Sequence, residues 1–213
     1  MALSNAVDQF ILSLERGLNA TRSHVEGTHR SNPAENFSNP SDLTEDEATH
    51  AAGLMRVNHT GEIAAQALYH GQSVFARSPE VRERLKHSAL EEEDHLIWCK
   101  QRVEELGSHT SILEPFWYWG SFSLGVIASA TGDKWSLGFI KETEDQVIHH
   151  LESHLTELPK NDTVSRLIIK QMIIDEGEHG DAAVQAGGVP LPAPVKVAMK
   201  LTSKIMTTLS YRF

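Results

Sequence analysis

Two short polar turns divide most of this sequence into two hairpins of long helices. Apolar residues recur with helical spacing in four stretches, residues 44–77, 79–106, 134–158 and 163–186. Ser78-Pro79 separates the first two stretches, and residues 159–162 separate the last two. No stretch alternates like a pair of strands, so the sequence predicts an all-α protein in which a long crossover joins two antiparallel helical hairpins.

The remaining segments are expected to add helices to these hairpins. Residues 115–132 carry no charge and are predicted to form an apolar crossover helix, and residues 195–209 are predicted to form an amphipathic C-terminal helix. Residues 1–40 are expected to hold a short helix followed by a polar linker, and residues 41–213 to form one bundle domain.

The acidic composition and the single cysteine exclude several classes of protein. A net charge of -10 at pH 7 argues against a nucleic-acid binder, which needs a basic face for phosphates. Cys99 has no partner for an internal disulfide, and the N-terminus has no basic stretch ahead of its apolar residues. Because no apolar run is long enough for a confident transmembrane span, we expect a protein of the reducing cytoplasm.

Four glutamates are placed symmetrically about the two turns. In an antiparallel hairpin, residues at equal distances from the bend face each other. The midpoint between Glu62 and Glu92 falls at residue 77, beside the first turn, and that between Glu144 and Glu176 falls at residue 160, within the second. We therefore expect each pair of carboxylates to meet inside the bundle.

Each hairpin also has a histidine three residues after one of these glutamates. Glu92 with His95, and Glu176 with His179, can each present a carboxylate and an imidazole on one helix face. The spacing alone is weak, because a chain with 20 Glu and 12 His gives about one such match by chance. Only these two pairs have a glutamate facing them across a turn. The other matches are Glu26/His29 and Glu47/His50.

A bundle core with four carboxylates and two imidazoles requires cations, since buried charges must be paired or coordinated. Oxygen and nitrogen ligands without thiolates suit iron or manganese and argue against a structural zinc site. The pattern is that of ferritin-like di-iron bundles. The predicted ligands of two iron ions are Glu62, Glu92, His95, Glu144, Glu176 and His179. The alternative is that these side chains are solvated charges on helix faces.

Two neighbouring carboxylates are candidates to orient the imidazoles. Asp175 and Glu91 each precede a predicted ligand, and each could accept the remaining N–H of the histidine on the opposing hairpin. Glu91 begins an acidic run, so simple solvation at the surface is an equally good interpretation of that residue.

The segments around these residues resemble the demethoxyubiquinone hydroxylase family, the di-iron monooxygenases of ubiquinone biosynthesis. The resemblance spans residues 42–181, and Glu144-Asp145 stands where family members often have Glu-Glu, which favours Glu144 as the ligand. Residues 1–40 show no recognised resemblance. The segments that carry it are Arg56-Val57-Asn58-His59-Thr60-Gly61-Glu62, which is the most specific, Glu92-Glu93-Asp94-His95, Glu144-Asp145-Gln146-Val147-Ile148-His149-His150 and Asp175-Glu176-Gly177-Glu178-His179.

The resemblance implies that two iron ions and dioxygen hydroxylate the ring of a polyprenylated methoxy-methyl-benzoquinone or its quinol. Electrons must come from an external donor or from the substrate, because no glycine motif for a nucleotide is present. The family uses a histidine in electron delivery, and His150 is the best positional match, although an exposed polar histidine is an equally good interpretation. A homo-oligomer or a complex of biosynthetic proteins is a further expectation.

A polyprenyl substrate resides in a membrane, so the apolar crossover helix and the C-terminal helix are candidates to contact the membrane surface. A cationic amphipathic helix near tryptophans is typical of an interfacial contact, so we expect a peripheral protein on the cytoplasmic side of a membrane. The alternative is that both segments only pack inside a soluble fold. The residues concerned are Lys196, Lys200 and Lys204 in the C-terminal helix and Trp117, Trp119 and Trp135 near the crossover.

Another ferritin-like oxidase, an iron-storage protein or a non-catalytic scaffold could share such a bundle. A rubrerythrin-type peroxidase usually carries a cysteine-rich module that one cysteine cannot supply, and a manganese catalase is a second oxidase. An iron-storage protein would need a cage with an acidic lumen. A non-catalytic scaffold of a lipid-biosynthesis complex would use the metal for stability alone.

Overall fold

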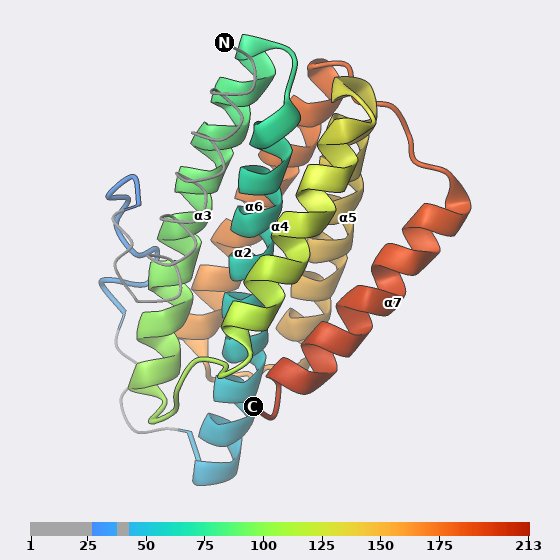
Figure 1. The fold of residues 1–213 in the computed structure, drawn as a ribbon. Helices are drawn as coiled ribbons and strands as arrows, with labels where there is room; N and C mark the ends of the chain where they lie inside the picture. Colours follow the sequence, from blue (N-terminus) through green and yellow to red (C-terminus); the bar gives the residue numbers. More distant parts are fainter. Residues whose placement is uncertain (1–26, 38–42) are drawn as a thin grey trace.

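The computed structural model describes residues 27–37 and 43–213, and within these ranges it is all-helical, as predicted (Figure 1). The predicted N-terminal helix lies outside the described residues. The prediction that residues 1–40 and 41–213 form separate units stays a prediction. The helices are α2 (Glu45–Phe75), α3 (Pro79–Glu105), α4 (Glu114–Ala130), α5 (Asp133–Glu157), α6 (Thr163–Gln185) and α7 (Ala193–Ser210).

The two hairpins begin and end where local chemistry requires it. Thr44 and Glu47 form a capping box ahead of α2, which satisfies two backbone N–H groups at its start. Ser78 caps α3, and Pro79 occupies its first position, where the missing N–H costs nothing. Asp162 caps α6 through the backbone N–H of Ser165.

Four helices, α2, α3, α5 and α6, form a ferritin-like bundle around one core. Its largest apolar cluster includes Met55, Trp98, Leu151 and Ile168, one from each helix. Near the second turn, Arg102 Nη2 donates to Asp162 Oδ1 at 3.0 Å, and both side chains are buried. This ion pair ties the first hairpin to the second.

The crossover helix α4 packs mainly against α2, with glycines at the crossing (Figure 1). A Cβ added to Gly71 of α2 would run into the backbone of α4, and one added to Gly125 of α4 would run into the backbone of α2. Gly71 and Gly125 therefore allow the two backbones to approach closely.

The last helix lies beside the bundle and is held at both ends. Near its start, Lys196 Nζ lies 2.5 Å from Glu142 Oε2 on α5. After its end, Arg56 of α2 donates from Nη1 to the carbonyl oxygen of Tyr211 at 3.0 Å. Residues of α7 between these two contacts form one wall of a cavity described below.

Candidate metal centre

The six predicted ligands converge at the centre of the bundle. All are buried, and the most exposed of them, His179, has a relative exposure of 8%. They form two groups, in each of which the ligand atoms lie within 4.8 Å of one another. The groups are Glu62, Glu92, His95 and Glu176, which we call the His95 subsite, and Glu92, Glu144, Glu176 and His179, which we call the His179 subsite.

The two subsites share Glu92 and Glu176, one from each hairpin. His95 Nδ1 lies 3.1 Å from Glu92 Oε2 and 3.2 Å from Glu176 Oε1. His179 Nδ1 lies 3.2 Å from Glu92 Oε1 and 3.2 Å from Glu176 Oε2. Each shared carboxylate thus points one oxygen toward each imidazole, which is the arrangement that two bridging carboxylates between two ions would have.

The charges and donor atoms fit a pair of divalent ions. Four carboxylates lie together, and within residues 27–37 and 43–213 their ion pairs are with histidines and none is with a lysine or arginine. Buried Glu144 Oε2 accepts no hydrogen bond in that part of the chain. Two divalent cations would balance four negative charges and coordinate this oxygen, which a core of this kind requires.

In the absence of ions, crowding shifts the pKa values of these groups in opposite directions. Burial, with the nearby charge of Glu92, raises the pKa of Glu62 well above its ordinary value, and burial with the charge of Glu176 does the same for Glu144. Burial would raise the pKa of Glu92 too, but hydrogen bonds with His179 and His95 outweigh it and lower that pKa. Protons can therefore occupy the positions that cations would take.

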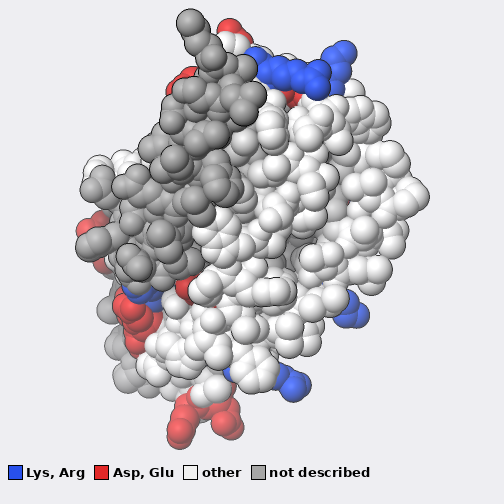
Figure 2. Space-filling model, in the orientation of Figure 1, with Lys and Arg blue, Asp and Glu red and all other residues white. Residues whose placement is uncertain are grey.

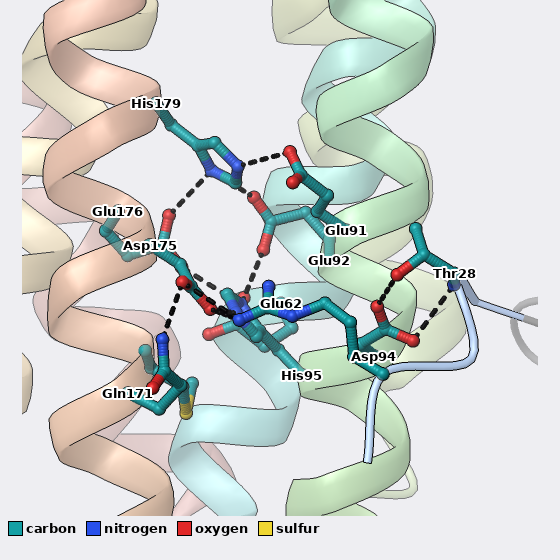
Figure 3. Close-up of polar contacts among 12 residues, drawn as sticks. Thr28, Glu62, Glu91, Glu92, Asp94, His95, Gln171, Asp175, Glu176 and His179 are labelled. Carbon is teal, nitrogen blue, oxygen red and sulfur yellow. Dashed lines mark hydrogen bonds and ion pairs between the residues drawn. The ribbon is translucent and has the colours of Figure 1, made fainter. Parts of the chain in front are cut away.

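The outer nitrogen of each imidazole meets a carboxylate from the opposite hairpin (Figure 3). His95 Nε2 lies 2.9 Å from Asp175 Oδ2, and His179 Nε2 lies 3.0 Å from Glu91 Oε2. These are the two carboxylates named from the sequence. Such partners fix the tautomer and orientation of a ligating imidazole, so that Nδ1 is free to face an ion.

Three contacts of the site were not anticipated from the sequence. Tyr69 donates its hydroxyl hydrogen to Glu144 Oε1, and Gln171 Nε2 donates to Asp175 Oδ1 at 2.9 Å. Helical spacing could have indicated both residues, because Tyr69 follows Glu62 by seven residues and Gln171 precedes Asp175 by four, which places each on the same helix face as a site residue. Arg30 also binds Asp175, at 2.9 Å from Nη2 to Oδ2, and no local pattern connects residues so far apart.

Glu47 and His50, one of the two other matches to the ligand spacing, lie outside the metal centre. Glu47 caps its own helix, and the imidazole of His50 meets the Tyr211 hydroxyl and a carbonyl oxygen. His29 is exposed, and its partner lies outside the described residues. Asp145 forms a surface ion pair with Lys141, whereas the neighbouring Glu144 is buried. Of the two adjacent acidic residues, Glu144 is therefore the one that faces the interior.

An apolar cavity of about 440 Å³ adjoins the His95 subsite. Its walls come from α2, α4, α5 and α7, and Glu62 is among the residues that line it. Gly61 lines it too, and a Cβ at this position would meet nothing within 4 Å. His150 also faces the cavity, and its ring centroid lies 4.0 Å from that of His154. The cavity therefore connects one predicted ligand with a space suited to an apolar molecule.

Residues 49–210 match the family model described as ubiquinone biosynthesis protein COQ7. The chain belongs to the COQ7 family. It is 53% identical to the 3-demethoxyubiquinol 3-hydroxylase of Polynucleobacter asymbioticus over 97% of this chain and 98% of that protein. It is 50% identical to the enzyme of the same name from Ralstonia pickettii, over 97% of this chain and 99% of that protein.

A third relative of the same name, from Francisella tularensis subsp. novicida, is 57% identical over 80% of this chain and 81% of that protein. These findings confirm the family resemblance, and the relatives' names support a hydroxylase of ubiquinone biosynthesis. In the first two relatives the similarity covers nearly the whole chain, so it extends beyond the bundle into the N-terminal region, where no resemblance was expected.

Proposed function

We propose that this COQ7-family protein is a di-iron monooxygenase that hydroxylates the ring of a polyprenylated methoxy-methyl-benzoquinone or its quinol with dioxygen. The observation that carries the proposal is the pair of buried subsites that share two carboxylates and meet an apolar cavity at Glu62. The names of the curated relatives support the same substrate class. Glu62, Glu92, His95, Glu144, Glu176 and His179 would hold the two ions.

The lining of the cavity supports an apolar substrate. Its lining combines aliphatic and aromatic side chains of α4 and α7 with Asn58, Thr143 and Gln146, which offer a few polar groups. A quinone ring could lie beside Glu62, with its prenyl chain between α4 and α7. Apolar walls would exclude water from the ring, and the few amides and hydroxyls would orient its oxygens.

Two iron ions would supply the reaction with dioxygen that places a hydroxyl group on the ring. The protein's own residues would do the positioning. Asp175 and Glu91 hold the imidazoles, and Tyr69 holds Glu144 by a hydrogen bond. An external donor would supply the electrons, and His150, which faces the cavity, is our candidate for that delivery.

We further propose that α4 and α7 contact a membrane surface, on its cytoplasmic side, where a polyprenyl substrate resides. A broad uncharged face with cations at its margin supports this (Figure 2). Large apolar side chains are exposed on both helices. They are Phe116, Leu124 and Ile127 on α4 and Val197, Leu201 and Ile205 on α7.

The described helices and the predicted tryptophans bear on this proposed contact in different ways. No helix in the described ranges is long and apolar enough to cross a membrane. Of the three tryptophans named from the sequence, Trp117 is buried and Trp119 packs against Phe122, whereas Trp135 is 43% exposed. Assembly with other copies or with biosynthetic proteins remains a proposal without structural support.

A pair of glycine substitutions tests the proposed function. Gly61→Leu would fill the cavity beside Glu62, and we expect turnover of demethoxyubiquinol to fall by about 10-fold or more because the ring is displaced. Gly177→Leu is the matched control, since Gly177 also adjoins a predicted ligand, lies within a helix and has open space at its Cβ, but does not line the cavity. Equal turnover by both variants at equal iron content would contradict the proposal.

A further inference from the structure

Residues 27–37, which we call the strap, bind the outer face of α3 beside the candidate metal centre (Figures 1 and 3). Asp94 of α3 is buried and accepts hydrogen bonds from the backbone N–H of Thr28, at 2.9 Å, and from its hydroxyl. Glu93 accepts from the backbone N–H of Gly27 at 3.0 Å. Two consecutive acidic residues of the family-like segment thus anchor the strap.

The first residue of the strap, Gly27, has to be a glycine for a geometric reason. Gly27 has a φ of 60°, and a Cβ at this position would collide with the carboxylate of Asp94. Farther along, Ala34 is buried in the core cluster that contains Trp98. The strap is therefore held at both ends by the bundle.

Between these anchors the strap presents one cation to the site. Arg30 Nη2 lies 2.9 Å from Asp175 Oδ2 and 3.1 Å from Asp175 Oδ1. The same guanidinium stacks over Trp98, with Cζ 5.3 Å from the ring centroid. The Trp98 ring in turn lies 5.3 Å from the ring of His95. Arg30 thus contacts both Asp175 and Trp98, the two side chains that support the His95 ring from outside the inner carboxylate cluster.

The other subsite has no equivalent support. Glu91, which holds His179, is approached by His87 at 3.7 Å, and the side chain of His87 is 69% exposed. No arginine or lysine ion pair to Glu91 is present among the residues that the structure describes. The two subsites share their bridging carboxylates but differ in how firmly their imidazoles are held.

We propose that Arg30 is a positioning residue that fixes His95 through Asp175 and Trp98, so that the His95 subsite binds its ion more tightly than the His179 subsite. This inference rests on the proposed di-iron function. A guanidinium that contacts both carboxylate oxygens and stacks on an indole restricts Asp175 to the orientation that receives the His95 N–H. The strap thereby acts as a structural part of the metal centre, although it lies outside the bundle.

Stepwise ion binding tests the inference without reference to turnover. Metal-free protein is titrated anaerobically with Co²⁺, and the visible absorption and the heat of each step are recorded. We expect Arg30→Gln to weaken the tighter of the two steps by about 10-fold and leave the other unchanged, and weakening of the weaker step alone would contradict the inference. Arg30→Lys, which keeps the charge but loses the planar fork and the stacking, should weaken the same step less.

Arg84→Gln on the exposed face of α3 is the matched control for loss of one positive charge, and it should bind both ions as the unaltered protein does. In an Asp175→Asn background, Arg30→Gln should add little, because the contact through which it acts is already weakened. Thr28→Val removes a strap anchor while leaving Arg30 in place, and it should weaken the same step, so it carries the test if Arg30→Gln does not fold.

The outcomes separate the two proposals. If the unaltered protein binds two ions and Arg30→Gln behaves like Arg84→Gln, the inference about the strap is wrong and the proposed function stands. Equal weakening of both steps would also contradict the inference, because it would indicate general loosening. If the unaltered protein binds fewer than two ions, the proposed function fails and the inference fails with it.

Discussion

His95 Nε2 lies 2.9 Å from Asp175 Oδ2, although the two residues are 80 positions apart and belong to different hairpins. The reciprocal contact joins His179 of the second hairpin to Glu91 of the first. Each imidazole is therefore oriented by the hairpin that does not carry it. The packing of the two hairpins against each other therefore forms both the inner carboxylate cluster and the outer histidine–carboxylate contacts.

Removing either outer carboxylate should weaken ion binding at one subsite. Asp175→Asn should lower affinity at the His95 subsite by about 10-fold or more, because the amide keeps an acceptor but loses the charge that polarises the imidazole. Glu91→Gln should act on the other subsite. The measurement is iron content after dialysis together with turnover. Asp175→Asn protein with the iron content and turnover of the unaltered enzyme would refute the role.

Ion binding should release protons from buried glutamates. Burial and neighbouring carboxylate charges raise the pKa of Glu62 and of Glu144, so in the metal-free protein these groups retain protons that an ion must displace. The metal-free fold should accordingly lose stability as pH rises through these raised pKa values. Calorimetric titration with Co²⁺ in Pipes and in Tris measures the release, because the two buffers differ in ionisation enthalpy. Identical heats in both buffers would contradict it.

His154 should make the metal-free protein sensitive to acid. Burial, with the charges of His150 and His50, lowers its pKa from 6.5 to about 3. The unfolded chain therefore binds a proton below pH 6.5 that the folded chain does not, so stability falls as pH falls toward 3. From pH 7.5 to pH 5 this one residue accounts for about 2 kcal/mol.

Urea unfolding of the metal-free protein at these two pH values measures the effect. His154→Gln should lose about 2 kcal/mol less than the unaltered protein on acidification. His109→Gln is the control, because His109 is exposed and its ring contacts only a neighbouring carbonyl oxygen. The same loss in all three proteins would show that His154 does not carry the acid sensitivity.

The helical hairpins were predictable from the sequence because their signals are local. The capping box at Thr44, Pro79 after Ser78, and the polar turn before α6 each fix a helix end within a few residues. The pairing of Glu62 with Glu92 then follows from antiparallel geometry. The same argument does not apply to residues outside a hairpin.

Contacts made by segments outside the two hairpins were not predictable. Nothing near Arg30 in the sequence indicates that the polar run around it binds α3 and reaches Asp175. The shape of the cavity also depends on how α7 lies between Lys196 and Tyr211, and helical spacing alone does not show which apolar side chains face inward. Met199 and Met206 line the cavity, whereas Leu201 is exposed.

Removing the exposed apolar face of α7 should weaken membrane binding. We expect a variant with Val197→Ser, Leu201→Ser and Ile205→Ser to sediment less with phosphatidylglycerol-containing vesicles, because it has less apolar area to bury in the interface. Deletion of residues 195–213 is a poorer test, since it would also remove a cavity wall.

The control for this variant changes exposed apolar residues on a different face. Ile174→Ser combined with Val184→Ser alters two exposed residues of α6, a helix that lies behind α4 in the view of Figure 1. It should bind vesicles as the unaltered protein does. Equal sedimentation of all three proteins would contradict the proposed membrane face.

Metal stoichiometry of the reduced protein tests the central claim most directly. Anaerobic loading with ⁵⁷Fe²⁺, followed by metal analysis and Mössbauer spectra before and after exposure to oxygen, should give two iron ions per chain in a coupled pair. Glu92→Gln, which alters a carboxylate shared by both subsites, should reduce binding at both. A single uncoupled ion per chain, or hydroxylation of demethoxyubiquinol by metal-free protein, would contradict the account.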